Sequence, residues 1–213
     1  MQGNLIQGLC GDGGQMDAAE LWRATLHDLN NLLAGFQGVL ELSDPKLPLD
    51  PLNRGRLEAS LEDGKTLIGM ARALALGRYP DAGMAPWNEW QAGLEERLAP
   101  MATLFRCRIE VVDAGASGTS WPAPIQQDWA AAFTRQILPW AAPGTLRIEA
   151  SAGPDHWSLL WFTDAPIPAA LQPDPAEGLS RNLPALWLKD VAGREGITLE
   201  KTHSGLVARL GRP

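Results

Sequence analysis

The sequence contains little that would direct it to nucleic acid, to a membrane or to an oxidising compartment. Its formal net charge is −7, and no basic cluster offsets this balance, which argues against a nucleic-acid partner. No apolar run approaches the ~20 residues of a membrane-spanning helix, and the N-terminus lacks the pattern of a signal peptide. Cys10 and Cys107 are the only cysteines and lack metal-ligand spacing, so we expect reduced thiols in a cytoplasmic protein.

The composition is otherwise that of an ordinary globular protein, with 45% hydrophobic and 20% charged residues. A chain of 213 residues can form one large domain or two small ones. There are no internal repeats. Residues 1–15 carry five glycines and little that could form a core, so we expect a loose leader there.

An amphipathic pattern from about Asp17 to about Leu42 predicts a long helix. Its apolar side chains recur at steps of four and three, as in a heptad seam that faces a partner helix: Trp22, Leu26, Leu29, Leu33, Phe36 and Leu40. Two prolines interrupt residues 43–50, and Asp50 followed by Pro51 is typical of a helix start.

A second helix is expected from Pro51 to about Leu76, with its own seam at steps of four and three: Leu57, Leu61, Gly64, Ile68, Ala71 and Ala75. Two helices of this length joined by a short loop form an antiparallel hairpin. An isolated hairpin cannot bury a seam on both helices. We therefore expect residues 16–78 to pair with a second copy in a homodimeric four-helix bundle.

Three polar residues of the first helix form a candidate chemical site. His27 lies one residue past a seam position, on the flank of the apolar stripe, where an imidazole stays in contact with water. Asp28 is its neighbour, and Asn31 follows one helical turn later on the same face. A lone exposed histidine is usually only a solvated side chain, and Asn31 can equally be an ordinary polar residue of the surface.

Residues 79–213 are expected to form a mixed α/β domain. Helical patterns alternate with short alternating apolar segments that are typical of strands. The expected order is αβαββαββ, with helices over 87–103, 124–140 and 183–195 and strands over 107–112, 144–151, 157–163, 197–202 and 206–210. Glycine-rich or proline-rich loops are expected between them.

A helical hairpin with His-Asp-Leu-Asn-Asn-Leu-Leu on its first helix, followed by this order of elements, resembles the two-domain core of sensor histidine kinases. The fold class implied is α+β, with a dimerisation and phosphoacceptor hairpin followed by an ATP-binding α/β sandwich. The resemblance implies that His27 carries a phosphoryl group and that Asp28 positions and deprotonates it. It also implies that Asn31 orients a water in a phosphatase reaction.

The nucleotide-binding motifs of that family are degraded here. The helix that should carry a magnesium-binding asparagine has none over residues 133–141. In residues 162–168, which match the adenine-reading Asp-x-Gly-x-Gly, only Asp164 survives, and residues 181–186 lack the glycines of the phosphate loop. Backbone amides cannot approach phosphates closely without such glycines. We therefore expect no bound ATP and no cofactor, with Mg²⁺ only on the receiver partner.

An intact histidine helix beside a degenerate nucleotide domain resembles the dimeric histidine phosphotransferases of bacterial phosphorelays. The expected activity is transfer of a phosphoryl group between His27 and an aspartate of a response regulator receiver domain. Two other interpretations stay open: a receiver phosphatase using Asp28 and Asn31, and a pseudokinase scaffold that only binds its partner. An active ATP-dependent kinase is the least favoured.

Overall fold

The computed structural model describes residues 18–43, 48–79, 83–163, 183–202 and 205–211. The chain divides into two compact units. One contains residues 14–78 together with 176–187, and the other contains residues 79–175 and 188–213 together with 1–13. The expected leader at 1–15 lies outside the described residues.

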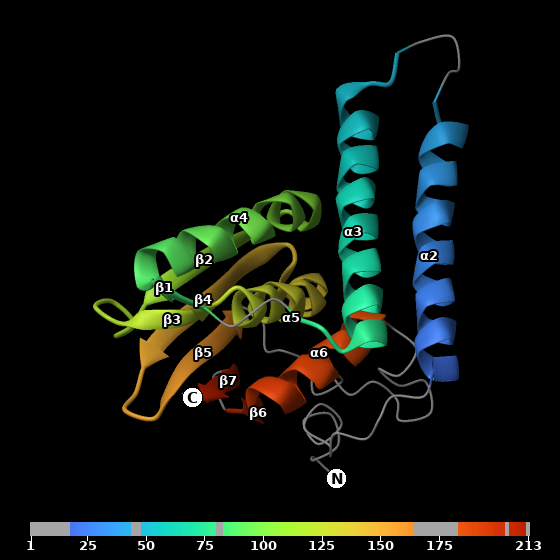
Figure 1. Cartoon of the computed structure of the whole chain (residues 1–213). Helices are drawn as coiled ribbons and strands as arrows, with labels where there is room; N and C mark the ends of the chain where they lie inside the picture. Colours follow the sequence, from blue (N-terminus) through green and yellow to red (C-terminus); the bar gives the residue numbers. More distant parts are fainter. Residues whose placement is uncertain (1–17, 44–47, 80–82, 164–182, 203–204, 212–213) are drawn as a thin grey trace. The chain divides into compact units, whose positions relative to one another are not determined.

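The first unit contains the predicted helical hairpin (Figure 1), with α2 at Ala18–Glu41 and α3 at Pro51–Leu76. Asp50 caps α3, because its Oδ1 accepts the backbone N–H of Asn53 at 3.0 Å. Gly77 ends α3 in the left-handed conformation, at φ 59°, which costs glycine nothing. The helix start and end therefore follow from residues that the sequence shows directly.

The two helices run side by side and are in contact (Figure 1), and one close approach between them indicates their register. A methyl group added at Gly64 of α3 would lie 3.2 Å from Leu32 Cδ2 of α2. Gly64 thus leaves room for the end of the Leu32 side chain. By antiparallel counting from this pair, His27 lies level with Gly69.

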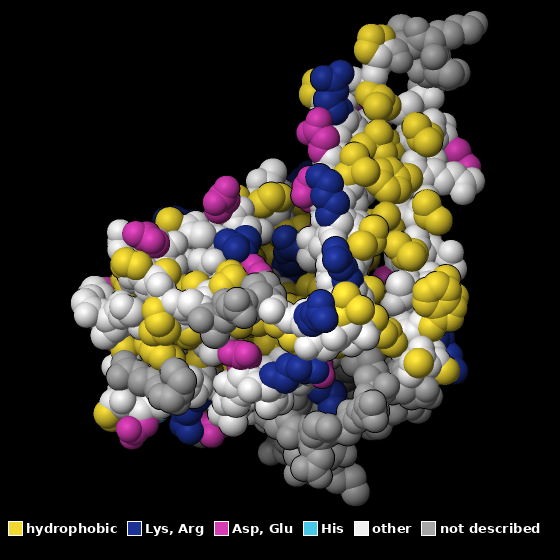
Figure 2. Space-filling view, in the orientation of Figure 1, with side chains coloured by type: hydrophobic (Ala, Val, Ile, Leu, Met, Phe, Trp, Pro, Cys, Tyr) yellow, Lys and Arg dark blue, Asp and Glu magenta, His cyan; other side chains and the backbone are white. Residues whose placement is uncertain are grey.

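Much of the apolar seam remains uncovered within one chain. The large apolar side chains exposed on the hairpin gather along its length in Figure 2. They are Trp22, Leu26, Leu33, Leu40, Leu42, Leu52, Leu61, Ile68 and Leu76. Leu33 is 60% exposed and Leu61 is 54% exposed, although both occupy seam positions. The intramolecular contact between α2 and α3 therefore buries only part of the two seams.

The second unit contains a five-stranded sheet of order β2-β4-β5-β7-β6. Its strands are β2 Cys107–Asp113, β4 Gly144–Ala152, β5 His156–Thr163, β6 Thr198–Lys201 and β7 Leu206–Gly211. Strands β2 and β4 are parallel, and the other neighbours are antiparallel. Helices α4 (Trp87–Phe105) and α5 (Ile125–Ala141) lie against this sheet (Figure 1). A further helix, α6, consists of residues Leu183–Glu195.

Alternation along the strands gives the sheet one apolar face. Ile148, Leu159 and Trp161 are completely buried, with Ile148 opposite Trp161 in the register. Trp161 Nε1 donates to Thr134 Oγ1 of α5 at 2.9 Å, so the polar edge of this indole is satisfied inside the core. The apolar face of the sheet is therefore joined to the helical layer by packing and by a buried hydrogen bond.

The alternate positions of the strands carry ion pairs instead of apolar side chains. Arg108 pairs with Glu110 on β2, Arg147 with Glu149 on β4, and Arg209 of β7 with Glu200 of β6. Because successive side chains of a strand point to opposite faces, these positions are kept away from the core. The result is a two-layer sandwich, which confirms the expected α+β class.

The structure adds a small two-stranded sheet to the expected order αβαββαββ. Strands β1 (Gly83–Pro86) and β3 (Ser120–Ala123) pair antiparallel, within segments expected to be irregular. Each strand is only four residues long and contains a proline, so neither shows alternation. The pair is held by aromatic packing, with the ring centroids of Trp90 and Trp121 5.0 Å apart and Trp90 Nε1 donating to the Pro122 carbonyl at 2.9 Å.

Among the described residues, no helix is long and apolar enough to cross a membrane.

Candidate phosphoacceptor site

The candidate site lies near the middle of α2, where all three predicted residues are described. His27, Asp28 and Asn31 share the helix, so their relative positions are fixed by its backbone. The His27 side chain is 56% exposed and that of Asp28 is 11% exposed. An accessible imidazole thus stands beside a largely covered carboxylate.

Both neighbours approach the same ring nitrogen. His27 Nδ1 lies 3.0 Å from Asp28 Oδ1 and 3.4 Å from Asn31 Nδ2. An ionised carboxylate can only accept a hydrogen bond, so the shorter contact requires the proton to be on Nδ1. In that tautomer Nε2 carries the lone pair, and the Asn31 amide lies beside the ring without donating to Nδ1. The geometry therefore selects the tautomer in which Nε2 is the nucleophilic atom.

The second oxygen of Asp28 has its own partner. Asp28 Oδ2 accepts the backbone N–H of Leu183 at 2.7 Å. Leu183 is the first residue of α6 and belongs to the same compact unit as the hairpin. A carboxylate is a favourable partner for the unpaired N–H groups at a helix N-terminus. No local pattern in the sequence predicts this contact, because Asp28 and Leu183 are 155 positions apart.

His27 Nε2 makes no hydrogen bond to any described residue. The site therefore offers a nitrogen lone pair on an exposed side chain, held in one orientation by Asp28, whose other oxygen is held by the Leu183 N–H. Such an arrangement suits nucleophilic attack on an electrophile brought by another molecule.

Among the described residues no group of His, Cys, Asp and Glu side chains could hold a metal ion. Asp164, Arg181 and Asn182 of the degraded nucleotide motifs lie outside the described residues. The helix expected to carry the magnesium-binding asparagine is α5, and Arg135 and Gln136 are among the residues found there instead.

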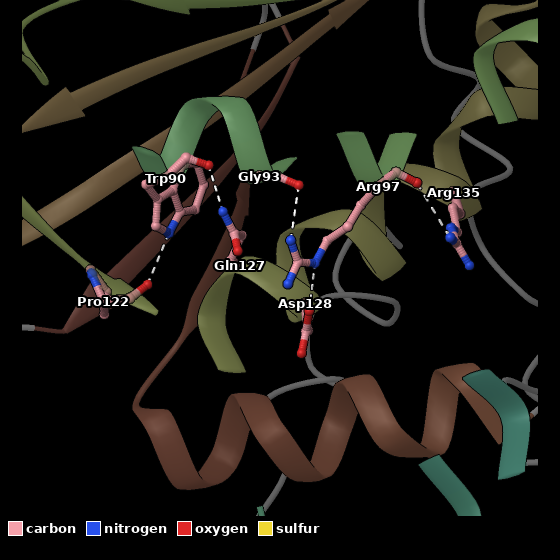
Figure 3. Close-up of polar contacts among 7 residues, drawn as sticks. All are labelled: Trp90, Gly93, Arg97, Pro122, Gln127, Asp128 and Arg135. Carbon is pink, nitrogen blue, oxygen red and sulfur yellow. Dashed lines mark hydrogen bonds and ion pairs between the residues drawn. The ribbon is translucent and has the colours of Figure 1, made fainter. Parts of the chain in front are cut away.

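Three polar side chains of α5 hydrogen-bond to α4 (Figure 3). Gln127 Nε2 donates to the Trp90 carbonyl at 2.5 Å, and Asp128 Oδ1 accepts from Arg97 Nε at 2.8 Å. Arg135 Nη2 donates to the Arg97 carbonyl at 3.4 Å. The same guanidinium of Arg97 also donates to the Gly93 carbonyl at 2.9 Å. These contacts serve the packing of one helix on the other.

No family model and no curated protein matches the sequence. Solved structures do match the fold. The Acinetobacter baumannii histidine kinase AdeS aligns with a TM-score of 0.60, at 13% identity, over 87% of this chain and 97% of that chain. The chain has the fold of a histidine kinase core. A structure of a bacterial phosphotransferase aligns with a TM-score of 0.51, also at 13% identity, over 91% of this chain and 97% of that chain.

These alignments cover both the hairpin and the α/β unit of the chain, since each spans more than four fifths of it. At 13% identity they establish a shared fold and leave the chemistry to the residues of the site.

Proposed function

We propose that this protein is a phosphotransfer protein of two-component signalling, in which His27 exchanges phosphoryl groups with receiver-domain aspartates. The observation that carries the proposal is the 3.0 Å contact between His27 Nδ1 and Asp28 Oδ1, on a His27 side chain that is 56% exposed and whose Nε2 binds no described residue. The fold shared with a histidine kinase and with a bacterial phosphotransferase supports the same class of function.

In the forward step, the Nε2 lone pair of His27 attacks the phosphorus of an aspartyl phosphate on the receiver. The P–N bond forms as the P–O bond breaks, and the bonding electrons leave with the receiver carboxylate. The ring then carries a positive charge with the proton still on Nδ1, where Asp28 Oδ1 stabilises it. The reverse step returns the group to another receiver. Mg²⁺ bound to the receiver would neutralise negative charge on the phosphoryl group from the receiver's side.

We infer that ATP is not the phosphoryl source. In support, the α5 segment 133–141 carries no asparagine. Arg135, which belongs to that segment, donates to an α4 carbonyl. The phosphoryl group would therefore have to come from a receiver.

We also propose that the working form is a homodimer built on the hairpin. Half-covered seams at Leu33 and Leu61 support this, because apolar side chains at heptad spacing are stabilised when a second hairpin covers them.

A receiver phosphatase is the second candidate, and the position of Asn31 favours it. Its amide nitrogen lies 3.4 Å from His27 Nδ1, so Asn31 shares the exposed site with His27 and would be placed to orient a water molecule at a docked receiver. In that reaction the water oxygen forms the new bond to phosphorus, and His27 is never phosphorylated. A scaffold that binds a receiver without reaction would need neither Asn31 nor the accessible Nε2.

A receiver carrying labelled aspartyl phosphate tests these alternatives. Label should move to the protein within minutes as an acid-labile, base-stable phosphoramidate. His27→Ala should abolish labelling, whereas the control His156→Ala should not. Asp28→Asn should slow transfer, because an amide cannot stabilise the charged ring as a carboxylate does. Asn30→Ala serves as the control for Asn31→Ala.

Inorganic phosphate as the sole product, at an undiminished rate in His27→Ala, would establish the phosphatase. Binding of the receiver with neither transfer nor phosphate release would establish the scaffold.

A further inference from the structure

Arg23 lies one helical turn before His27 on α2, and Asn31 lies one turn after it. Residues four apart on a helix are surface neighbours, with Cβ atoms roughly 5–6 Å apart. Arg23, His27 and Asn31 are all exposed. Within the part of the chain that the structure describes, no carboxylate forms an ion pair with Arg23. A cation is thus available on the face that carries the imidazole.

The orientation of the His27 ring places its two nitrogens differently. Nδ1 faces Asp28 and Asn31, which follow His27 in the chain. Nε2 is the other nitrogen of the planar ring, and its lone pair diverges from the side on which Nδ1 contacts Asp28 and Asn31. Helical side chains also lean toward the preceding turn, which here is the turn of Arg23. A group bonded to Nε2 would therefore stand within the range of the long Arg23 side chain.

The charge on such a group requires a partner. A phosphoryl group carries nearly two negative charges, whereas the positive charge of the protonated ring is already matched by the Asp28 carboxylate. A guanidinium offers five N–H donors in a planar fork that can bind two phosphoryl oxygens at once. We propose that Arg23 is a catalytic residue of the phosphotransfer site, which binds the phosphoryl oxygens while the group is on His27. This assignment rests on the proposed function of His27.

One other cation must be distinguished from Arg23. The Leu32–Gly64 approach sets the antiparallel register, so Arg72 of α3 lies about level with the turn before His27. Arg72 is also exposed, but it belongs to the other helix of the hairpin. Arg72→Gln is therefore the matched control for Arg23→Gln, with the same residue type, the same change in charge and nearly the same height on the hairpin.

The first experiment needs no receiver. Phosphoramidate can phosphorylate a histidine directly: Nε2 attacks phosphorus, the P–N bond to the leaving nitrogen breaks, and ammonia departs. Phosphorus NMR of the phosphorylated protein, followed against pH, then gives the pKa of the phosphoryl group. A nearby cation lowers that pKa. We expect the phosphoryl pKa to be higher in Arg23→Gln than in the native protein by several tenths of a unit, and unchanged in Arg72→Gln. Equal values in native protein and Arg23→Gln would overturn the assignment.

The second experiment measures single-turnover transfer from a phosphorylated receiver at increasing receiver concentration. We expect Arg23→Gln to lower the maximal rate roughly 10–100-fold, less than for an arginine buried in a phosphoryl-transfer site, because solvent screens this exposed one. Arg23→Lys should recover part of that rate. A change confined to the half-saturating concentration would mean that Arg23 only attracts the receiver, and would overturn the catalytic role.

The two experiments separate failure of this inference from failure of the proposed function. Suppose that no receiver exchanges phosphate, but the protein phosphorylated with phosphoramidate still shows a phosphoryl pKa that depends on Arg23. The proposed phosphotransfer function is then wrong, and the contact between Arg23 and the phosphoryl group is supported. If receivers exchange label normally with Arg23→Gln, the function stands and the inference about Arg23 is wrong.

Discussion

Replacement of two glycines of α3 by alanine tests the register that presents His27. Alanine in a helix interior is about 1 kcal/mol more favourable than glycine. A methyl group added at Gly69 would meet no atom within 4 Å, so Gly69→Ala should raise the free energy of unfolding of the hairpin by about 1 kcal/mol. The same change at Gly64 adds a methyl group 3.2 Å from Leu32 Cδ2 and 3.7 Å from Cδ1.

The Leu32 side chain must then turn away from its preferred rotamer, which costs roughly 0.5–1.5 kcal/mol. Gain and cost are similar in size, so Gly64→Ala should change the free energy of unfolding of the hairpin by roughly 0.5 kcal/mol or less in either direction. The expected difference between the two variants is about 1 kcal/mol. In a Leu32→Ala background the crowding disappears, and Gly64→Ala should recover most of the gain seen at Gly69.

Urea unfolding followed by the helical circular dichroism signal gives the comparison, at one fixed protein concentration because association would add to the apparent stability. Hydrogen exchange of the α3 amides assigns the change to the hairpin. Equal stabilisation by Gly64→Ala and Gly69→Ala would show that Leu32 does not lie over Gly64. The antiparallel register, and with it the height of His27 relative to Arg72, would then be wrong.

Three further predictions concern association, nucleotide and pH. Light scattering should give a dimer at micromolar concentration, and Leu33→Asp should convert it to a monomer, because an unpaired charge in the bundle costs about several kcal/mol; a native monomer would refute the bundle. Calorimetry with ATP and Mg²⁺ should show no binding, and micromolar affinity would return the chain to the active kinases. Burial and the hydrogen bond to Asp190 raise the pKa of Tyr79, the only tyrosine. The pKa of Tyr79 measured by ultraviolet titration should therefore lie above the ordinary value of about 10 in the native protein and return to that value in denaturant. The contribution of neutral Tyr79 to the free energy of unfolding should be complete below pH ~10 and lost at higher pH, where Tyr79 ionises in the unfolded chain only. Tyr79→Phe should remove this pH-dependent loss of stability.

The helices could be predicted from the sequence because their signals are local. The helix α3 begins at Pro51 and ends at Leu76, as expected, because Asp50 and Gly77 supply the cap and the left-handed stop. Strands β4 and β5 were found through their alternation, which follows from one buried and one exposed face.

Contacts between distant segments could not be predicted in the same way. Strands β1 and β3 depend on each other and on Trp90 and Trp121, and neither segment has a period of its own. At the site, the spacing of His27, Asp28 and Asn31 predicted their shared face. It did not indicate which ring nitrogen Asp28 contacts, or that its second oxygen accepts the Leu183 N–H.

The ion pairs on the outer face of the sheet have a practical consequence. The three pairs, at Arg108 with Glu110, Arg147 with Glu149 and Arg209 with Glu200, contain equal numbers of positive and negative groups. They add nothing to the net charge of −7, which must arise elsewhere in the chain. Single exposed pairs of this kind contribute about 0–1 kcal/mol each. Replacement of Arg108, which is 77% exposed, by a residue that carries a fluorescent or spin label should therefore leave the fold intact. Such a label would report on the motion and surroundings of the α/β unit.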